Sequence, residues 1–324
     1  MAEIWPGTPA NIAKAAAELK AGQLVAFPTE TVYGLGANAL DDDAVRAIYT
    51  AKGRPSFNPL IVHVPDLNAA RTFARIDARA ERLEAQFMPG PLTLVVPQKP
   101  ASRISRFATA DLPTVAIRVP RHPIARALIS AAEVPVVAPS ANRSGHVSAT
   151  TAVHVAHDLG QALPVILDGG PCNIGLESTI IDLSQSDSWA ILRDGAVSAE
   201  QIGAVIDGRV LQQPAAVAPQ EIKAPGQLES HYAPAVPVYL NRHRAAPGEA
   251  YLGYGGHQDD TAEHWLNLSP TGDLNEAATQ LFAMLRQLED CPITAIAVAP
   301  IPNSGIGIAI NDRLRRAAAP KSTQ

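Results

Sequence analysis

The sequence predicts an α/β protein with two domains, a larger N-terminal one built on a mixed sheet and a smaller C-terminal one. Helical and strand-like segments alternate along most of the 324 residues, which is the pattern of an α/β sheet. A stretch rich in proline and alanine, residues 209–237, has no periodicity and divides the chain. A chain of this length also usually forms about two domains.

The first elements follow from their start and stop signals. Thr8 as N-cap, followed by a proline, predicts a helix over residues 8–20. The apolar residues 23–29 are typical of a short buried strand. Residues 41–54 begin with aspartates and end with bases, which complements a helix dipole and predicts a second helix. The same kinds of signal predict strands at 59–64, 92–97 and 114–120 and one long helix over 68–87.

The second half of the N-terminal domain contains helices at 123–132 and 153–160 and a strand at 134–142 that runs into a polar loop. Three short strands follow at 164–170, 178–184 and 189–195, and their close spacing favours hairpins, hence an antiparallel portion in the sheet. Beyond the proline-rich stretch, we expect strands at 236–240, 249–256, 264–269 and 293–301 and helices at 273–290 and 307–319. The expected domains are 1–207 and 237–324, with a linker at 208–236.

Composition narrows the class of protein. Hydrophobic residues make up 47% and charged residues 18%, as in ordinary globular proteins. A net charge of −5 and an aromatic share of 5% argue against strong unassisted binding of nucleic acid. Cys172 and Cys291 lie far apart, so a disulfide framework or zinc site is not expected. With no apolar run of roughly 18 residues and no signal-peptide pattern, a cytoplasmic protein with no membrane segment is expected.

The segment "KGRPSFNPL", Lys52 to Leu60, places two cations on a loop stiffened by prolines, directly after a predicted helix. Two cations on a rigid loop can clamp an anion, and the arginine fork suits phosphate or carboxylate. The alternative is that these bases only complement the helix dipole.

Other polar segments also follow strands, where α/β proteins bind ligands. They are "PTETVYGLG" at 28–36 and "APSANRSGHVSAT" at 138–150, although hydroxyls that satisfy a structural turn explain them equally well. "DGGPCNIGLEST" at 168–179 lacks the GK[ST] ending of a phosphate loop, and neither GxGxxG nor HExxH occurs. In the linker, "SHYAP" at 230–234 places a histidine and a tyrosine where no core is available, unless they dock elsewhere.

Taken in order, "PTETVYGLG", "KGRP…NPLIVHV", "TVAIRVP", "APSAN.SG", "ESTIID" and "LRDGA" resemble the YrdC-type core of the threonylcarbamoyl-AMP synthases over roughly residues 8–205. The KxR…SxN signature of that family matches Lys52, Arg54, Ser140 and Asn142. "APGQLESHYAP" and the following α/β unit resemble the long form of the family, with a Rossmann-like C-terminal domain.

The resemblance implies synthesis of threonylcarbamoyl-AMP and pyrophosphate from L-threonine, bicarbonate and ATP. The product would pass to threonylcarbamoyl-transferase proteins for t6A modification of tRNA, with at most a weak direct tRNA contact. The implied catalytic residues are the four signature residues. The implied ATP site comprises Lys52, Arg54, Asn58, Thr114, Ser140, Asn142, Ser148, Arg193, His231 and Tyr232. The implied threonine site comprises Thr31, His63, Arg118, Ala138 and Ser178.

Mg2+ is expected as a cofactor held through the ATP phosphates, without a protein metal site. His231 and Tyr232 would make the linker a lid over the nucleotide. Two alternatives belong to other classes. One is an RNA-binding module, which the net charge disfavours. The other is a carbamoyltransferase that handles carbamoyl-adenylate, because hydrogenase-maturation proteins contain the same core, although they are much longer and carry zinc-finger segments.

Overall fold

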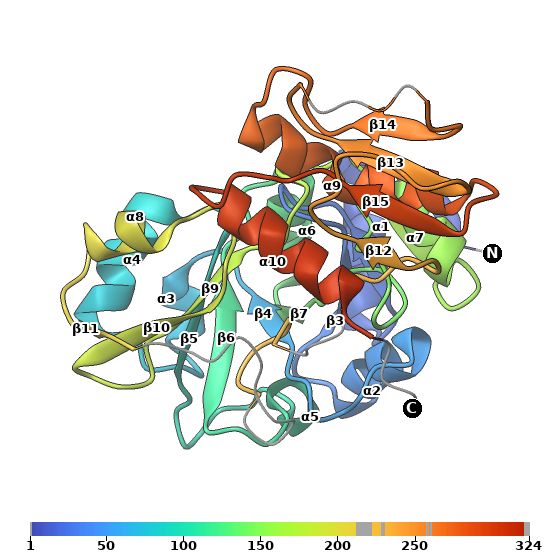
Figure 1. Ribbon diagram of the computed structural model, residues 1–324. Coiled ribbons are helices and arrows are strands. Elements are labelled where there is room, and N and C mark those ends of the chain that lie inside the picture. Colours follow the sequence, from blue (N-terminus) through green and yellow to red (C-terminus); the bar gives the residue numbers. More distant parts are fainter. Residues whose placement is uncertain (1, 212–221, 228–230, 257–258, 260, 321–324) are drawn as a thin grey trace.

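The protein is described here from a computed structural model, which covers residues 2–211, 222–227, 231–256, 259 and 261–320 (Figure 1). In these residues the chain forms an eleven-stranded sheet and a separate four-stranded sheet. The strands of the larger sheet are β1 (Glu3–Pro6), β2 (Val25–Phe27), β3 (Gly34–Asn38), β4 (Ile61–His63), β5 (Leu92–Pro97), β6 (Thr114–Arg118), β7 (Val136–Val137), β8 (Val165–Asp168), β9 (Thr179–Asp182), β10 (Ser188–Arg193) and β11 (Arg209–Val210). The helices around it are α1 (Pro9–Lys20), α2 (Asp42–Lys52), α3 (Leu67–Ala70), α4 (Ala78–Phe87), α5 (Arg106–Thr109), α6 (Pro123–Ala132), α7 (Ala152–Leu159) and α8 (Ala199–Gly203).

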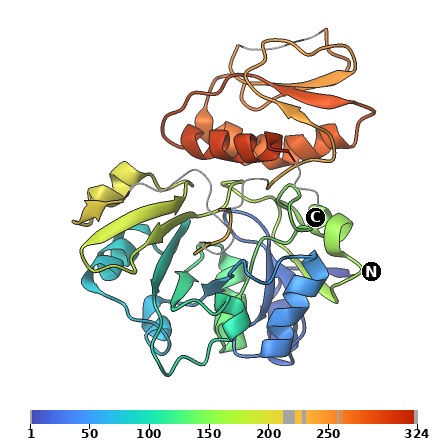
Figure 2. The same ribbon diagram turned by 60° about the horizontal axis from the view of Figure 1, so that its bottom comes forward.

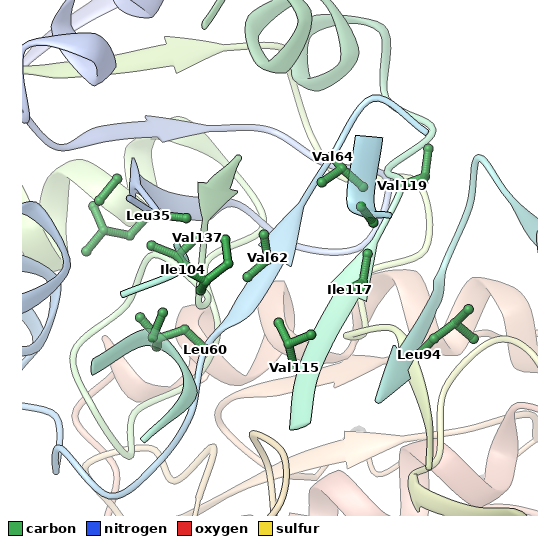
Figure 3. Close-up of a cluster of buried hydrophobic side chains, with 14 of the residues drawn as sticks. Leu35, Leu60, Val62, Val64, Leu94, Ile104, Val115, Ile117, Val119 and Val137 are labelled. Carbon is green, nitrogen blue, oxygen red and sulfur yellow. The ribbon is translucent and has the colours of Figure 1, made fainter. Parts of the chain in front are cut away.

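The larger sheet mixes parallel and antiparallel pairs, as the sequence predicts. Its order is β1-β8-β2-β3-β7-β4-β6-β5-β9-β10-β11. The pair β4–β6 is parallel, whereas β5–β6 and β9–β10 are antiparallel. Alternate residues of β4, β5 and β6 carry apolar side chains into the main core, among them Val62, Leu94 and Ile117 (Figure 3). The opposite positions of the same strands are free to carry polar groups, because successive side chains point to opposite faces.

Local capping explains why the helices begin and end where they do. The hydroxyl of Thr8 accepts the backbone N–H of Asn11 and caps α1. The Asp41 carboxylate caps α2, and Gly53, in the left-handed conformation at φ 60°, ends it. The predicted helix starts at residues 8 and 41 are therefore confirmed.

Two sequence predictions about the sheet and its helices are wrong. The helix expected over 68–87 is divided into α3 and α4, because Arg75 donates its N–H to the carbonyl of Pro97 and Asp77 caps a new helix. The strands expected to form consecutive hairpins do so only for β9 and β10, since β8 pairs in parallel with β1 and β2. β1 and β3 lie in segments where the sequence predicts no strand.

The smaller sheet contains β12 (Val238–Tyr239), β13 (Glu249–Gly253), β14 (Trp265–Asn267) and β15 (Ala295–Val298) in the order β12-β15-β13-β14. All its pairs are parallel, as expected for a Rossmann-like unit. Its helices, α9 (Leu274–Glu289) and α10 (Gly307–Ala318), lie on the side that faces the larger sheet, where Figure 2 shows them in orange-red and red. We propose 1–207 and 237–324 as the boundaries of the two domains. Of the helices in the described part of the chain, none has both the length and the apolar character needed to cross a membrane.

Candidate active site

The strand register places three polar side chains side by side in the middle of the larger sheet. His63, the last residue of β4, pairs with Arg118, the last residue of β6. Arg118 in turn pairs with Thr93 of β5. Directly paired residues of neighbouring strands point to the same face of a sheet. All three side chains are buried, so the sheet presents a polar surface at this point.

A small cavity of about 40 Å³ lies over this polar surface. Loops that follow strands of the larger sheet and residues of the linker enclose it. Of the residues predicted from the sequence, those that line it are Arg54, His63, Arg118, Ala138, Ser140, Arg193, His231 and Tyr232. The structure thus brings together residues that are up to 178 positions apart in the chain, counted from Arg54 to Tyr232 (232 − 54).

Two buried guanidinium groups line the cavity without an ion pair among the described residues. Arg54 donates to the carbonyls of Asn58 and Pro59, at 3.4 and 3.1 Å. Arg193 donates to the carbonyl and the hydroxyl of Ser178, at 3.0 and 3.1 Å. Buried cations without a carboxylate partner are costly. An anionic ligand, such as a polyphosphate, would neutralise both.

Lys52 connects the basic loop to the SxN loop. Its ammonium donates to the carbonyls of Ser140, at 2.6 Å, and of Asn142. Burial, and next the charge of Arg54, hold the pKa of Lys52 well below its ordinary range. Lys52 is therefore buried and connects two loops by hydrogen bonds. A base that only complements the helix dipole would instead be exposed to solvent.

Among the residues that the structure describes, two amide oxygens near these loops have no hydrogen-bond donor. Asn142 donates its amide N–H groups to the carbonyls of Arg143 and His146, but its Oδ1 has no partner. Oδ1 of Asn58, in the basic loop, is also buried and unpartnered. Buried acceptors without a donor are rare in folded proteins. Both atoms can accept a hydrogen bond from a ligand or bind a hydrated cation.

On the other side of the cavity, Arg118 is oriented by Glu30. The guanidinium pairs with one carboxylate oxygen of Glu30 at 2.7 Å, while the other oxygen accepts the backbone N–H groups of Arg121 and His122. Burial raises the pKa of Glu30, but the charge and hydrogen bond of Arg118 outweigh burial and lower it. Arg118 is thus a cation in a fixed position on the wall of the cavity, where a guanidinium can pair with a substrate carboxylate.

Five other predicted residues do not line the cavity themselves. The hydroxyl of Ser178 shares a hydrogen bond of 2.7 Å with Thr93, and that of Thr31 shares one of 2.8 Å with Thr29. Ser148 donates to Glu177, which lines the cavity. Thr114 does not line the cavity, because it begins β6 whereas Arg118 ends it. Asn58 does not line the cavity itself, but its carbonyl accepts a hydrogen bond from Arg54, which does.

The site also contains residues that the sequence analysis did not identify. Thr93 lacks a local signal, because only the pairing of β5 with β6 brings it to the site. Glu30 and Glu177 lie inside quoted motifs next to predicted residues, so two buried carboxylates could have been proposed as partners of the arginines. Arg313 and Phe282, from the C-terminal domain, contact the linker and carry no signal in their own segments.

Two buried histidines of the site predict an acid-sensitive fold. Burial, reinforced by Arg118, lowers the pKa of His63 to about 3, and burial likewise lowers that of His231 to about 3. In the unfolded chain the pKa is near 6.5, so the unfolded state binds more protons between these values and stability falls as pH drops from 6.5 towards 3. At pH 5 we expect each histidine to cost about 2 kcal/mol of the free energy of unfolding.

Denaturant unfolding at pH 7.5 and pH 5 measures this loss. His63→Gln and His231→Gln should each lose less stability than the parent between the two pH values. An unchanged difference would show that these imidazoles are protonated in the folded state.

Comparison with known proteins agrees with this geometry. A family model of Sua5, YciO and YrdC, described as "Telomere recombination", matches residues 17–195, and one described as "Threonylcarbamoyl-AMP synthase, C-terminal domain" matches 197–319. The threonylcarbamoyl-AMP synthase of Bacillus subtilis (strain 168) is 40% identical over 323 residues, covering 95% of this chain and 93% of the relative. That of Pyrococcus abyssi (strain GE5 / Orsay) is also 40% identical over 323 residues, covering 94% of this chain and 93% of the relative.

The crystal structure of P. abyssi Sua5 complexed with L-threonine superimposes with a TM-score of 0.89 at 38% identity and covers 98% of this chain and 97% of that one. A mixed-sheet α/β fold with a buried cavity whose Arg54 and Arg193 have no ion pair among the described residues is suited to anionic substrates. More specifically, the chain belongs to the threonylcarbamoyl-AMP synthase family.

Proposed function

We propose that the protein is a nucleotidyltransferase that forms threonylcarbamoyl-AMP and pyrophosphate from L-threonine, bicarbonate and ATP. One observation carries the proposal: one cavity holds two guanidinium groups that form no ion pair with any residue the structure describes, Arg54 and Arg193, and a third, Arg118, oriented by Glu30. The first two suit a polyphosphate and the third suits an amino-acid carboxylate. Membership of the family supports the same assignment.

The reaction follows from this division of the cavity. The threonine amine adds to bicarbonate and loses water to give a carbamate, whose oxygen attacks the α-phosphorus of ATP. A new O–P bond forms and the bond to the β-phosphate breaks, so pyrophosphate leaves with the electron pair. Arg54 and Arg193 would neutralise the charge that develops on the phosphates. Arg118 would hold the threonine carboxylate, which orients the amine.

Lys52 would act mainly through position. Its ammonium joins the loops of Arg54 and Asn142, and its two carbonyl partners leave it little freedom. His63 stays neutral above pH 3, since burial lowers its pKa to about 3, so it can hydrogen-bond the substrate without adding charge. Mutual orientation of substrates, rather than proton transfer by a side chain, is therefore the main contribution that we assign to the protein.

When bound, Mg2+ would neutralise part of the negative charge on the ATP phosphates. In the described part of the chain no group of three or more His, Cys, Asp or Glu could hold a metal ion. The unpartnered Oδ1 atoms of Asn58 and Asn142 fit a hydrated cation, since Mg2+ prefers oxygen ligands and keeps several waters. Mg2+ would thus be held largely through ATP.

The linker would act as a lid. Pro225, Gly226, His231 and Tyr232 line the cavity, and Tyr232 is almost completely buried. Sites for ligands of this size occupy roughly 300–1,000 Å³. The cavity of about 40 Å³ is far smaller, so these residues must move to admit ATP. Their return would exclude water from the adenylate, which hydrolyses readily.

The product would be consumed by a transferase that carries the threonylcarbamoyl group to tRNA, in the cytoplasm where ATP and tRNA are present. A net charge of −5 is consistent with at most a weak direct contact with tRNA.

Pyrophosphate release by the purified protein tests the proposed function. With ATP, Mg2+ and bicarbonate, we expect release only when L-threonine is added, and we expect Arg54→Ala to reduce it by about a hundredfold, because charge-assisted phosphate contacts are among the strongest in proteins. Release without threonine, or none under any condition, would contradict the proposal and favour carbamoyl transfer or RNA binding. A salt-dependent RNA affinity would then decide between these two.

A further inference from the structure

The C-terminal domain reaches the lid with two side chains. Phe282 lies on α9 and Arg313 on α10, the helices that face the N-terminal domain (Figure 2). Both side chains are completely buried. The ring of Phe282 stacks on that of Tyr232, with centroids 5.6 Å apart and planes at 24°. The guanidinium of Arg313 lies 5.2 Å from the centroid of the same ring. Tyr232 is therefore held between two side chains of the C-terminal domain.

Arg313 also contacts the N-terminal domain with the remaining edges of its guanidinium. Nε pairs with Glu177 at 2.9 Å, and Nη2 donates to the carbonyl of Asp194 at 2.9 Å. Nη1 pairs with Asp312 of its own helix at 2.9 Å, which fixes the plane of the group. Asp194 directly follows Arg193, so Arg313 contacts the backbone next to one of the two arginines that we assign to phosphate.

Glu177 connects Arg313 to Ser148, a residue of the predicted ATP site. One of its oxygens pairs with Arg313, and the other accepts the hydroxyl of Ser148. Burial would raise the pKa of Glu177, but the charges of Arg313 and then Arg193 lower it. The carboxylate thus stays ionised and fixed between Arg313 and Ser148, within the wall of the cavity.

The backbone of Tyr232 needs such support. Its φ is 63°, in the left-handed region that a bulky L-residue adopts only when its surroundings impose it. The neighbouring His231 has no hydrogen-bond partner for its Nδ1 within the described parts of the chain, and its ring centroid lies 4.1 Å from that of Tyr232. The described contacts that could impose the strained conformation on Tyr232 include those with Phe282 and Arg313.

We infer that Arg313 is a positioning residue through which the C-terminal domain holds the lid closed and fixes Glu177 and Ser148 at the ATP site. This inference rests on the proposed role of Tyr232 in the lid. When Arg313 is removed, Tyr232 loses the cation over its ring and Glu177 loses its partner. The closed lid then becomes less populated, so ATP binds more weakly and the adenylate escapes before it is passed on.

A structural role alone makes a different prediction. A buried ion pair between domains can stabilise their association without affecting substrate affinity. In that case Arg313→Met would lower the Tm and the yield of folded protein but leave the KM for ATP and the retention of product unchanged. Measurements of the KM for ATP and of product retention therefore distinguish the two roles, whereas a measurement of stability does not.

The experiment uses the full chain with Arg313→Met, Arg313→Lys, Tyr232→Ala and the double variant Arg313→Met/Tyr232→Ala. Arg242→Met is the matched control, because Arg242 is an exposed arginine of the same domain that does not line the cavity. For each protein we would measure pyrophosphate release against ATP concentration, the share of threonylcarbamoyl-AMP that stays bound during gel filtration, and the Tm.

We expect Arg313→Met to raise the KM for ATP by about tenfold to a hundredfold, as loss of a supporting residue does at other sites, and to lose most bound product. Arg313→Lys keeps the positive charge but not the planar guanidinium, so its KM for ATP and its product retention should lie between those of Arg313→Met and the parent. It also replaces Arg313→Met as the test variant if that protein does not fold. Because both residues act through the lid, the double variant should be no more than about twofold worse than Tyr232→Ala.

If the folded Arg313 variants keep the parental KM and product retention while Tyr232→Ala is impaired, the inference is overturned but the proposal of a lid stands. Parental behaviour of Tyr232→Ala would instead overturn the lid. Additive losses in the double variant would show that Arg313 acts independently of Tyr232, which also contradicts the inference.

Discussion

Arg118→Met is expected to weaken threonine-dependent pyrophosphate release, lowering kcat/KM for threonine by about a hundredfold. The guanidinium is buried at the edge of the cavity and already oriented by Glu30. Losing a hydrogen bond to a charged group costs ~1.5–3 kcal/mol, and about 1.4 kcal/mol is a tenfold change. The KM for ATP should change far less, because Arg54 and Arg193 remain.

This substitution also leaves Glu30 as an unpaired buried carboxylate, which by itself destabilises a protein by ~3–5 kcal/mol. The double variant Arg118→Met/Glu30→Gln removes both charges and controls for this effect. We expect it to recover most of the lost stability in denaturant unfolding without recovering threonine-dependent turnover. Recovery of threonine-dependent turnover in the double variant would show that Arg118 supports the fold and does not bind the substrate.

Replacing residues 224–234 with a glycine-serine segment of equal length is expected to reduce formation of threonylcarbamoyl-AMP by about a hundredfold, the order that a misplaced substrate costs. The replacement removes Ala224 and Tyr232 from their buried positions, but the main core of each domain keeps its other members. The protein should therefore remain folded by circular dichroism. Pyrophosphate release and product formation, measured side by side, show whether turnover stops or the adenylate is released and hydrolysed.

A glycine-serine replacement at residues 241–244, an exposed segment of the C-terminal domain that does not line the cavity, provides the control. It should leave turnover at the parental level. Full activity after replacement of residues 224–234 would contradict the lid, whereas equal loss in both proteins would point to a general effect of the segment on folding.

How far the sequence predicts the fold depends on how local each signal is. α6 and α9 were expected at their observed positions to within one residue, because their caps and apolar periodicity lie within the helix itself. The helix over 68–87 was predicted wrongly, because hydrogen bonds from the end of β5 interrupt it. Its second half nevertheless begins at Asp77, whose capping role is a local signal that could have been used.

The same distinction applies to the site. Lys52 and Arg54 were proposed from one short loop, in which residue type and spacing alone suggest an anion clamp, whereas Asn142 was assigned to the site through the family resemblance. Their roles as substrate contacts stay predictions. That Lys52 connects two loops by hydrogen bonds could not be predicted, because its partners lie 88 and 90 residues away.

The sequence by itself determined the class of this protein, its alternation of helices and strands, and the basic loop that supplies Lys52 and Arg54. Caps, periodicity and turn residues act over one or two helical turns, so they are present in any short window of the chain. Only the tertiary structure decided which strands are neighbours, that His63, Arg118 and Thr93 share a face, and that Arg313 contacts Glu177 across 136 residues. Such pairings depend on packing between distant segments, which no local pattern specifies.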